Sequence, residues 1–159
     1  MVLTYQQYEA ELKRMTREAT HEAHLQFAKE TIALLHRSVA ARIPVELTGR
    51  EQELLTEILA AIAGDAREQL RLPLSELVAN VTADDVRAVE FHPDFAELLC
   101  AIDHLIEYQA SQDPGRIARI GINMVNSIDW RIDGLPENIL SAPEMLEEYE
   151  RQKRSLLGP

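Results

Sequence analysis

Apolar residues recur every three or four positions along most of the chain, which is the spacing of one face of an α-helix. The first such stretch runs from Thr4 to about Arg42, and its apolar face shifts near Thr20. This shift predicts two helices or one bent helix, ended by Pro44. No run of alternating apolar and polar residues is long enough for a convincing β-strand, so the pattern predicts an all-α fold.

Capping and turn residues divide the rest of the chain into further helices. Thr48 and Glu51 have the spacing of a capping box, Pro93 begins another apolar stripe, and Asp113–Gly115 forms a turn before the next. The connections are short, so consecutive helices are expected to pack antiparallel. We therefore expect a single domain over residues 1–159, an up-down helical bundle of five to seven helices.

The apolar stripes also predict which side chains form the core. Cys100 lies beside one stripe and is expected to be a buried structural cysteine, and Trp130 is expected to fill space in the core. Tyr108 is expected outside the core. The predicted core consists of Phe27, Ile32, Leu35, Leu55, Ile58, Leu59, Ile62, Phe95, Leu98, Leu99, Ile102, Leu105, Ile120, Met124, Ile128 and Leu146.

Acidic residues are concentrated in the middle of the chain. The whole chain has a formal net charge of −11, and residues 46–113 alone, with 15 acids against four arginines, also sum to −11. Residues 1–45 sum to +1 and residues 114–159 to −1. Such a charge repels nucleic acid and anionic membranes and attracts a basic protein, so we expect no nucleic-acid or membrane partner.

The acidic segment supplies the candidate partner-binding residues. Helical spacing places many of its carboxylates away from the apolar stripes, and we predict that they form one negative face together with an aromatic side chain. An ordinary solvated surface that keeps the protein soluble is the alternative. The predicted partner-binding residues are Glu53, Glu57, Asp84, Asp85, Glu90, Asp94, Glu97, Asp103, Glu107 and Tyr108.

One short motif has the spacing of a metal site. Glu18 and His21 form a Glu-x-x-His pair, which di-iron helical bundles use in duplicate. The chain has only one such pair, since His104 and Glu107 stand in the reverse order, and the lone Cys100 excludes a multi-cysteine zinc site. We therefore predict no metal and no cofactor.

The sequence contains no recognisable catalytic motif and no targeting signal. Its six glycines are scattered rather than gathered into a phosphate-binding loop, and no serine lies in a nucleophile elbow. No long apolar run predicts a membrane span, and the first residues do not form a secretory signal. We expect a non-enzymatic protein of the cytoplasm.

Three segments resemble a group of small helical bacterial families. They are HLQFAKETIALLHR, FAELLCAIDHLIEYQASQDPGRIARIGINMVNSID and APEMLEEYERQKRSLL, and they cover about half of the chain. The third is similar to a closing helix whose pattern is carried here by Pro143, Glu148 and Gln152. The families are the immunity proteins of bacterial polymorphic-toxin systems and a related family of unknown function. The resemblance implies a helical immunity protein, and it assigns no functional residue.

Three hypotheses about function follow. The leading one is an immunity protein (antitoxin) that neutralises a cognate, basic toxin through the acidic face, by occluding the active site or locking the toxin. The second is a small metal-dependent hydrolase, which would need several of Glu18, His21, Asp94, Glu97 and His104 to converge. The third is a helical interaction module that associates with itself.

Overall fold

The computed structural model describes residues 1–65 and 67–159, and this part is helical, without strands. It forms an all-α single domain, as predicted. Seven helices of 12 to 19 residues and the six-residue α6 put the number of helices slightly above five to seven. The elements are α1 (Tyr5–Glu18), α2 (His21–Val39), η1 (Ala40–Arg42), α3 (Ile43–Glu46), α4 (Gly49–Ala63), η2 (Arg67–Gln69), α5 (Arg71–Thr82), α6 (Asp85–Glu90), α7 (Pro93–Ser111), α8 (Pro114–Arg131), η3 (Ile139–Ser141) and α9 (Pro143–Leu157).

Side-chain caps define where α2 and α4 begin. The hydroxyl of Thr20 accepts a hydrogen bond from the N–H of Ala23, so α2 is a separate helix and the apolar face shifts where the sequence predicted. The capping box of Thr48 and Glu51 is present at the start of α4. Pro44 does not end the first segment, because α2 stops at Val39 and the proline lies in the first turn of the short α3.

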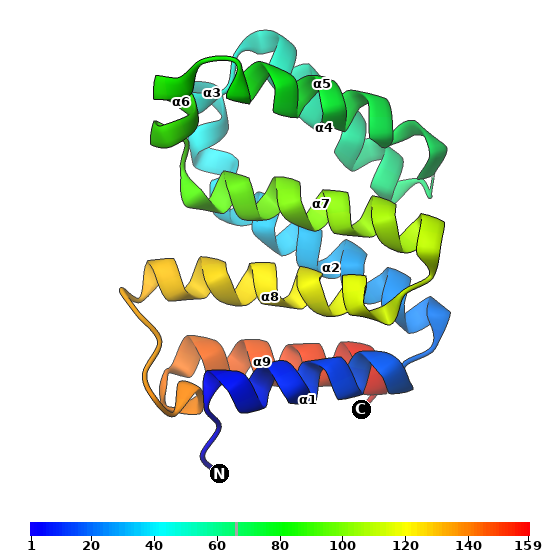
Figure 1. Ribbon diagram of the computed structural model, residues 1–159, viewed down its shortest axis with the longest axis vertical. Helices are drawn as coiled ribbons and strands as arrows, with labels where there is room; N and C mark the ends of the chain where they lie inside the picture. Colours follow the sequence, from blue (N-terminus) through cyan, green and yellow to red (C-terminus); the bar gives the residue numbers. More distant parts are fainter. Residues whose placement is uncertain (66) are drawn as a thin grey trace.

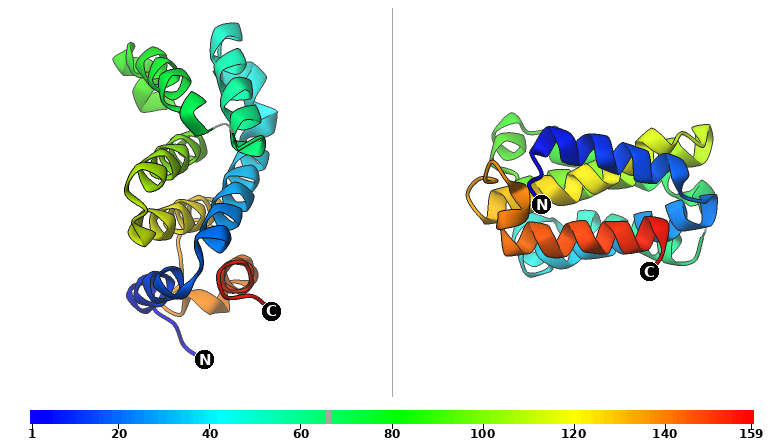
Figure 2. Two further views of the ribbon diagram at one scale, coloured as in Figure 1. Left: turned by 90° about the vertical axis from the view of Figure 1, so that its right-hand side faces the viewer. Right: turned by 90° about the horizontal axis from the view of Figure 1, so that it is seen from below.

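The helices lie across the long axis of the molecule in successive layers (Figure 1). The helices α1 and α9 form one end, α8 and α7 follow, and α4 and α5 form the other end. Seen from the side, α2 and then α4 run along one flank, opposite α8, α7 and α5 (Figure 2). Consecutive long helices run in opposite directions (Figure 1), and α2 packs on α7, α8 and α9.

Gly121 lies at a close crossing, where α8 passes α1 and α2. A Cβ atom at this position would lie 2.9 Å from Cδ2 of Leu12 and 3.2 Å from Cζ of Phe27. Both neighbours are fully buried. A glycine inside a helix costs about 1 kcal/mol relative to alanine, and here that cost permits the helices to approach one another.

A buried glutamine joins the last helix to the same crossing. The hydroxyl of Tyr8 donates to Oε1 of Gln152 at 2.5 Å, and Nε2 of Gln152 donates to the carbonyl of Gly121 at 3.2 Å and to Oε2 of Glu148 at 3.0 Å. Gln152 is completely buried. Since an unpaired amide in a core is costly, these bonds fix how α9 sits on α1 and α8.

Most of the predicted core is confirmed, with three differences. Leu59 and Leu99 are only partly buried, and Leu146 is 44% exposed because Met145 and Tyr149 are the residues of α9 that point inward. The confirmed members are Phe27, Ile32, Leu35, Leu55, Ile58, Ile62, Phe95, Leu98, Ile102, Leu105, Ile120, Met124 and Ile128.

Three further predictions about burial are wrong. Cys100 is exposed, because its side of α7 faces the space between α5 and α7. Trp130, at the end of α8, is 63% exposed, whereas Tyr108 is 1% exposed between α7 and α2.

Within the described residues, no helix combines the length and the apolar character needed to cross a membrane.

The crossing at Gly121 yields a stability prediction. We expect Gly121→Ala to lower the free energy of unfolding by about 1–2 kcal/mol, because overpacking of the core outweighs the gain in helix propensity. Urea unfolding followed by circular dichroism measures this difference. Gly49→Ala is the control, since no atom lies within 4 Å of a Cβ there. Equal stability of the Gly121→Ala variant and the unaltered protein would show that the crossing is not tight.

Candidate functional site

The structure divides the predicted acidic face into exposed and buried members. Most of the set is exposed on α4, α6 and α7, but Asp94 and Tyr108 are buried, so a partner cannot reach them. Asp94 accepts a hydrogen bond from the hydroxyl of Ser127 at 2.9 Å. The exposed or partly exposed members that carry a charge are Glu53, Glu57, Asp84, Asp85, Glu90, Glu97, Asp103 and Glu107.

Glu97 is a structural carboxylate that joins α7 to α8. Its Oε2 accepts from Nδ2 of Asn123 at 2.6 Å, and its Oε1 accepts from Nδ2 of Asn126 at 3.3 Å. Burial raises the pKa of Glu97, while hydrogen bonds from both asparagines oppose the rise. Glu97, predicted as a partner-binding residue, is thus bound between α7 and α8 in the structure.

Tyr108 connects α7 to two histidines of α2. Its hydroxyl oxygen lies 2.7 Å from Nδ1 of His21 and 2.8 Å from Nδ1 of His24. Nε2 of His24 lies 2.6 Å from the carbonyl of Thr16, which can only accept, so this nitrogen carries a proton. In the neutral ring Nδ1 of His24 then accepts from the Tyr108 hydroxyl, whose oxygen accepts from Nδ1–H of His21.

These bonds leave the Glu18–His21 pair with structural roles. His21 is held by the tyrosine, and Glu18 forms an ion pair of 2.7 Å with Arg14. His104 lies apart from both, 3.5 Å from Arg116 on α8. Among the described residues no group of three histidine, cysteine or carboxylate side chains could hold a metal ion.

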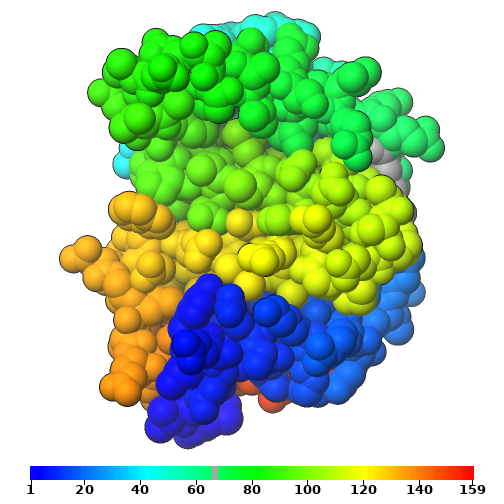
Figure 3. Space-filling view, in the orientation of Figure 1, coloured from blue at the N-terminus to red at the C-terminus, as the bar shows by residue number. Residues whose placement is uncertain are grey.

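An apolar groove of about 530 Å³ opens between α5 and α7. Figure 3 shows the boundary between these helices on the face of Figure 1. Neighbouring protein atoms remove part of the water around the Cys100 thiol and raise its pKa, and the charges of Glu97 and Asp103 act in the same direction, so this thiol is a weak nucleophile. The lining residues are Leu74, Val78, Val81, Thr82, Ala88, Phe91, Ala96, Leu99, Cys100, Asp103 and His104.

Acidic residues of the predicted set line this apolar groove or lie on the short helix next to it. Asp103 lines it directly from α7. The exposed Asp85 and Glu90 belong to α6, which contributes the lining residue Ala88, and the exposed Asp84 is the N-cap of this helix. The structure thus combines part of the predicted acidic face with an apolar surface that the sequence analysis did not identify.

One buried ion pair holds α6 in place. No residue of α6 is buried, but Nη1 of Arg87 donates to Oε2 of Glu51 at 2.6 Å and Nη2 donates to the carbonyl of Glu46 at 2.8 Å. Glu51 is 1% exposed, and the hydrogen bonds from Arg87 lower the pKa of its carboxyl against the effect of burial. The position of one wall of the apolar groove therefore depends on this pair.

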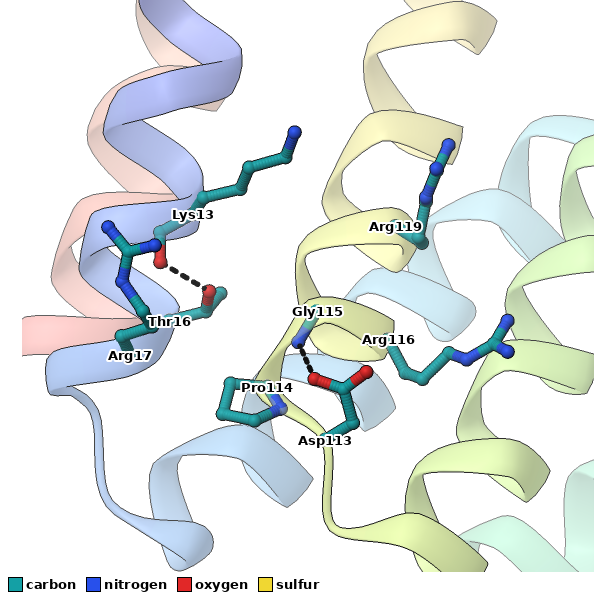
Figure 4. Close-up of a pocket in the computed structure, with 8 residues that line it drawn as sticks. All are labelled: Lys13, Thr16, Arg17, Asp113, Pro114, Gly115, Arg116 and Arg119. Atoms are coloured by element: carbon teal, nitrogen blue, oxygen red, sulfur yellow. Dashed lines mark hydrogen bonds between the residues drawn. The ribbon is translucent and has the colours of Figure 1, made fainter.

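A second groove, of about 610 Å³, lies between α1 and the start of α8 (Figure 4). Lys13 and Arg17 line it from α1, and Arg116 and Arg119 line it from α8. Lys13 extends toward the gap, while Arg116 turns toward α7. Within the described residues none of these four side chains forms an ion pair.

The sequence held signals for both grooves. Leu74, Val78 and Val81 have the spacing of one helix face, within a stretch that lacks a strong stripe otherwise. The basic pairs are spaced by four residues on α1 and by three on α8, which places each pair on one side of its helix. Sequence alone does not reveal that these two sides face each other.

No protein-family model, no curated protein and no solved structure matches this chain significantly. The interpretation of the two grooves therefore depends on their own geometry and charge.

The buried ion pair yields a prediction with a defined pH dependence. Replacing Arg87 by methionine leaves the Glu51 carboxylate buried without its partner. We expect a loss of about 1–3 kcal/mol at pH 7, less than for a fully enclosed pair because the Arg87 side chain is 28% exposed. The Glu51 pKa is lowered in the folded protein, so the pair stabilises above the unfolded value of about 4.3 and this contribution disappears as the pH falls through the folded pKa.

Urea unfolding of the Arg87→Met variant at pH 7 and near pH 3 tests this prediction. The deficit relative to the unaltered protein should shrink at the lower pH. Arg50→Met is the matched control, since its partners Glu53 and Glu76 are exposed and such pairs contribute about 1 kcal/mol or less. An Arg87→Met deficit that is absent at pH 7, or that grows in acid, would contradict the assignment.

Proposed function

We propose that this protein is a non-enzymatic binding protein that captures a basic partner, in the role of an immunity protein that neutralises a toxin in the cytoplasm. The observation that carries the proposal is the apolar groove between α5 and α7, which Asp103 lines and which adjoins the exposed acids of α6. Asp85, Glu90 and Asp103 form no ion pair within the described residues, so their charges remain available.

The proposed occupant of this groove is an amphipathic helix with a basic face. Its apolar side chains would contact Leu74, Val78 and Leu99, and its lysines or arginines would meet the acids along the edges. Val86 and Val89 on the neighbouring α6 are also exposed. A groove lined in this way provides apolar anchors, while the acids orient the partner and accelerate encounter.

The charges and the apolar contacts would act on different rate constants. The net charge of −11 raises the rate of encounter with a basic protein, by about 10- to 1000-fold at low salt for steered association. Desolvated apolar contacts slow dissociation, which is where most affinity differences between related complexes arise. Together they suit a protein that must meet a toxin quickly and hold it.

The specific role as an immunity protein is supported by the resemblance of three segments to such proteins. In the structure the second of these segments forms the hairpin of α7 and α8, joined by the short turn at Asp113. This hairpin supplies one wall of the apolar groove through α7. The metal-dependent hydrolase has no comparable support, because Asp94, Glu97 and His21 have structural partners.

The test uses two matched double charge reversals. Glu90→Lys with Asp103→Lys changes the edges of the apolar groove, and Glu147→Lys with Glu150→Lys makes the same change in net charge on α9, at the other end of the molecule (Figure 1). All four sites are exposed, so we expect both variants to fold. The probe is a synthetic lysine–leucine amphipathic helix, with association measured by stopped-flow fluorescence at low and moderate salt.

We expect the groove variant to slow association with this probe by about tenfold at low salt and to flatten its salt dependence. The α9 variant should change association much less. Equal effects of both variants would show that only overall charge matters.

The same variants then test the biological role: co-expression of this chain should rescue cells from a basic toxin, and the groove variant should lose the rescue. Dimerisation through the groove, detected by light scattering and abolished by Leu99→Glu, would instead favour self-association.

A further inference from the structure

The groove between α1 and α8 gathers positive charge in a protein that is strongly negative overall. Lys13 and Arg17 line one wall and Arg116 and Arg119 line the other, and none of them has a carboxylate partner within the described residues. Arg14, on the same helix but outside the groove, pairs with two glutamates. Neutralisation is therefore missing on the side of α1 that faces the groove.

Four unneutralised cations on two facing walls are unfavourable without a counter-charge. Like charges three or four residues apart on one helix destabilise it slightly, and both helices carry such a pair here. Among the described residues, Asp113 is the one acid that lines the groove, and its carboxylate caps α8 through the N–H of Gly115 at 2.9 Å. The groove thus retains a net positive charge, and a bound anion would relieve the repulsion.

The other lining groups define the chemistry of such a ligand. Apart from the charged side chains, the groove is lined by Thr16, Pro114 and Gly115, with no aromatic ring on which a base could stack. The hydroxyl of Thr16 is turned to the carbonyl of Lys13 at 3.0 Å (Figure 4). Recognition must come from the guanidinium and ammonium groups, which favour phosphate and carboxylate oxygens.

Size and surrounding charge favour a compact ligand. A volume of about 610 Å³ lies within the range of small-molecule sites, about 300–1000 Å³. A nucleic acid extends well beyond such a groove, and the remainder of this protein, with a net charge of −11, repels it. An anion with several charges in a short span experiences the local cations most strongly.

We propose that the groove between α1 and α8 binds a small molecule through a chain of two or three phosphate groups. Lys13 and Arg119 reach the phosphates from opposite walls, and Arg17 and Arg116 complete the positive lining. This site is separate from the apolar groove, and it does not depend on the proposed capture of a basic partner.

Isothermal titration calorimetry with inorganic triphosphate tests the proposal on the full-length protein at low salt. We expect saturable binding of one triphosphate per chain, weakened by added sodium chloride. Lys13→Gln with Arg119→Gln should weaken binding by at least about tenfold, as expected for loss of charge-assisted hydrogen bonds. Both residues are exposed, so we expect the variant to fold, and circular dichroism verifies this.

The matched control is Arg131→Gln with Arg154→Gln, which removes two unpaired cations that line a different part of the surface. This variant should bind triphosphate as the unaltered protein does. Binding of ATP with the same or higher affinity also supports the proposal and indicates whether the rest of a nucleotide contributes. The proposal is overturned by a lack of saturable binding, by equal losses in both variants, or by binding of an oligoglutamate peptide in preference to triphosphate.

Discussion

The close approach of three helices at Gly121 is the constraint on which the rest of the structure depends. Because this position has no side chain, α8 can lie directly against Leu12 of α1 and Phe27 of α2, and Gln152 adds a hydrogen bond from α9 to the same point. The distance between α1 and α8 sets the width of the groove between these two helices, which Lys13 and Arg119 line. Since α7 packs along the other side of α8, the crossing also places the wall on which the apolar groove is built.

The positions of the helices could be predicted from the sequence more fully than the contacts between them. The shift of the apolar face near Thr20 and the cap at Thr48 correspond to real helix boundaries. Periodicity does not say how much of an apolar surface a neighbour will cover. Leu99 and Cys100 border the stripe of α7, but α5 leaves a space beside them, whereas Tyr108 finds two histidines of α2 at a distance of more than eighty residues.

The candidate sites were harder to predict because charge was summed along the chain rather than in space. The sum counts Asp94 and Glu97 as surface acids, although Ser127 and two asparagines of α8 bind them. The sum also conceals the groove between α1 and α8. The basic residues of segments 1–45 and 114–159 are nearly balanced by acids of the same segments, but most of these acids do not line the groove. Which charges remain unpaired is a property of helix packing.

Arg116 belongs to one groove and contacts the other. Its Nη1 lies 3.5 Å from Nδ1 of His104, a ring that lines the apolar groove, and burial together with the charge of Arg116 lowers the pKa of that ring. An anion held at Arg116 would offset this charge and increase the proton affinity of His104. Thermodynamic reciprocity then requires that protonation of His104 increases the affinity for the anion by the same factor. An anion in the groove between α1 and α8 and a proton on His104 in the apolar groove would thus favour each other's binding, with Arg116 as the link between them.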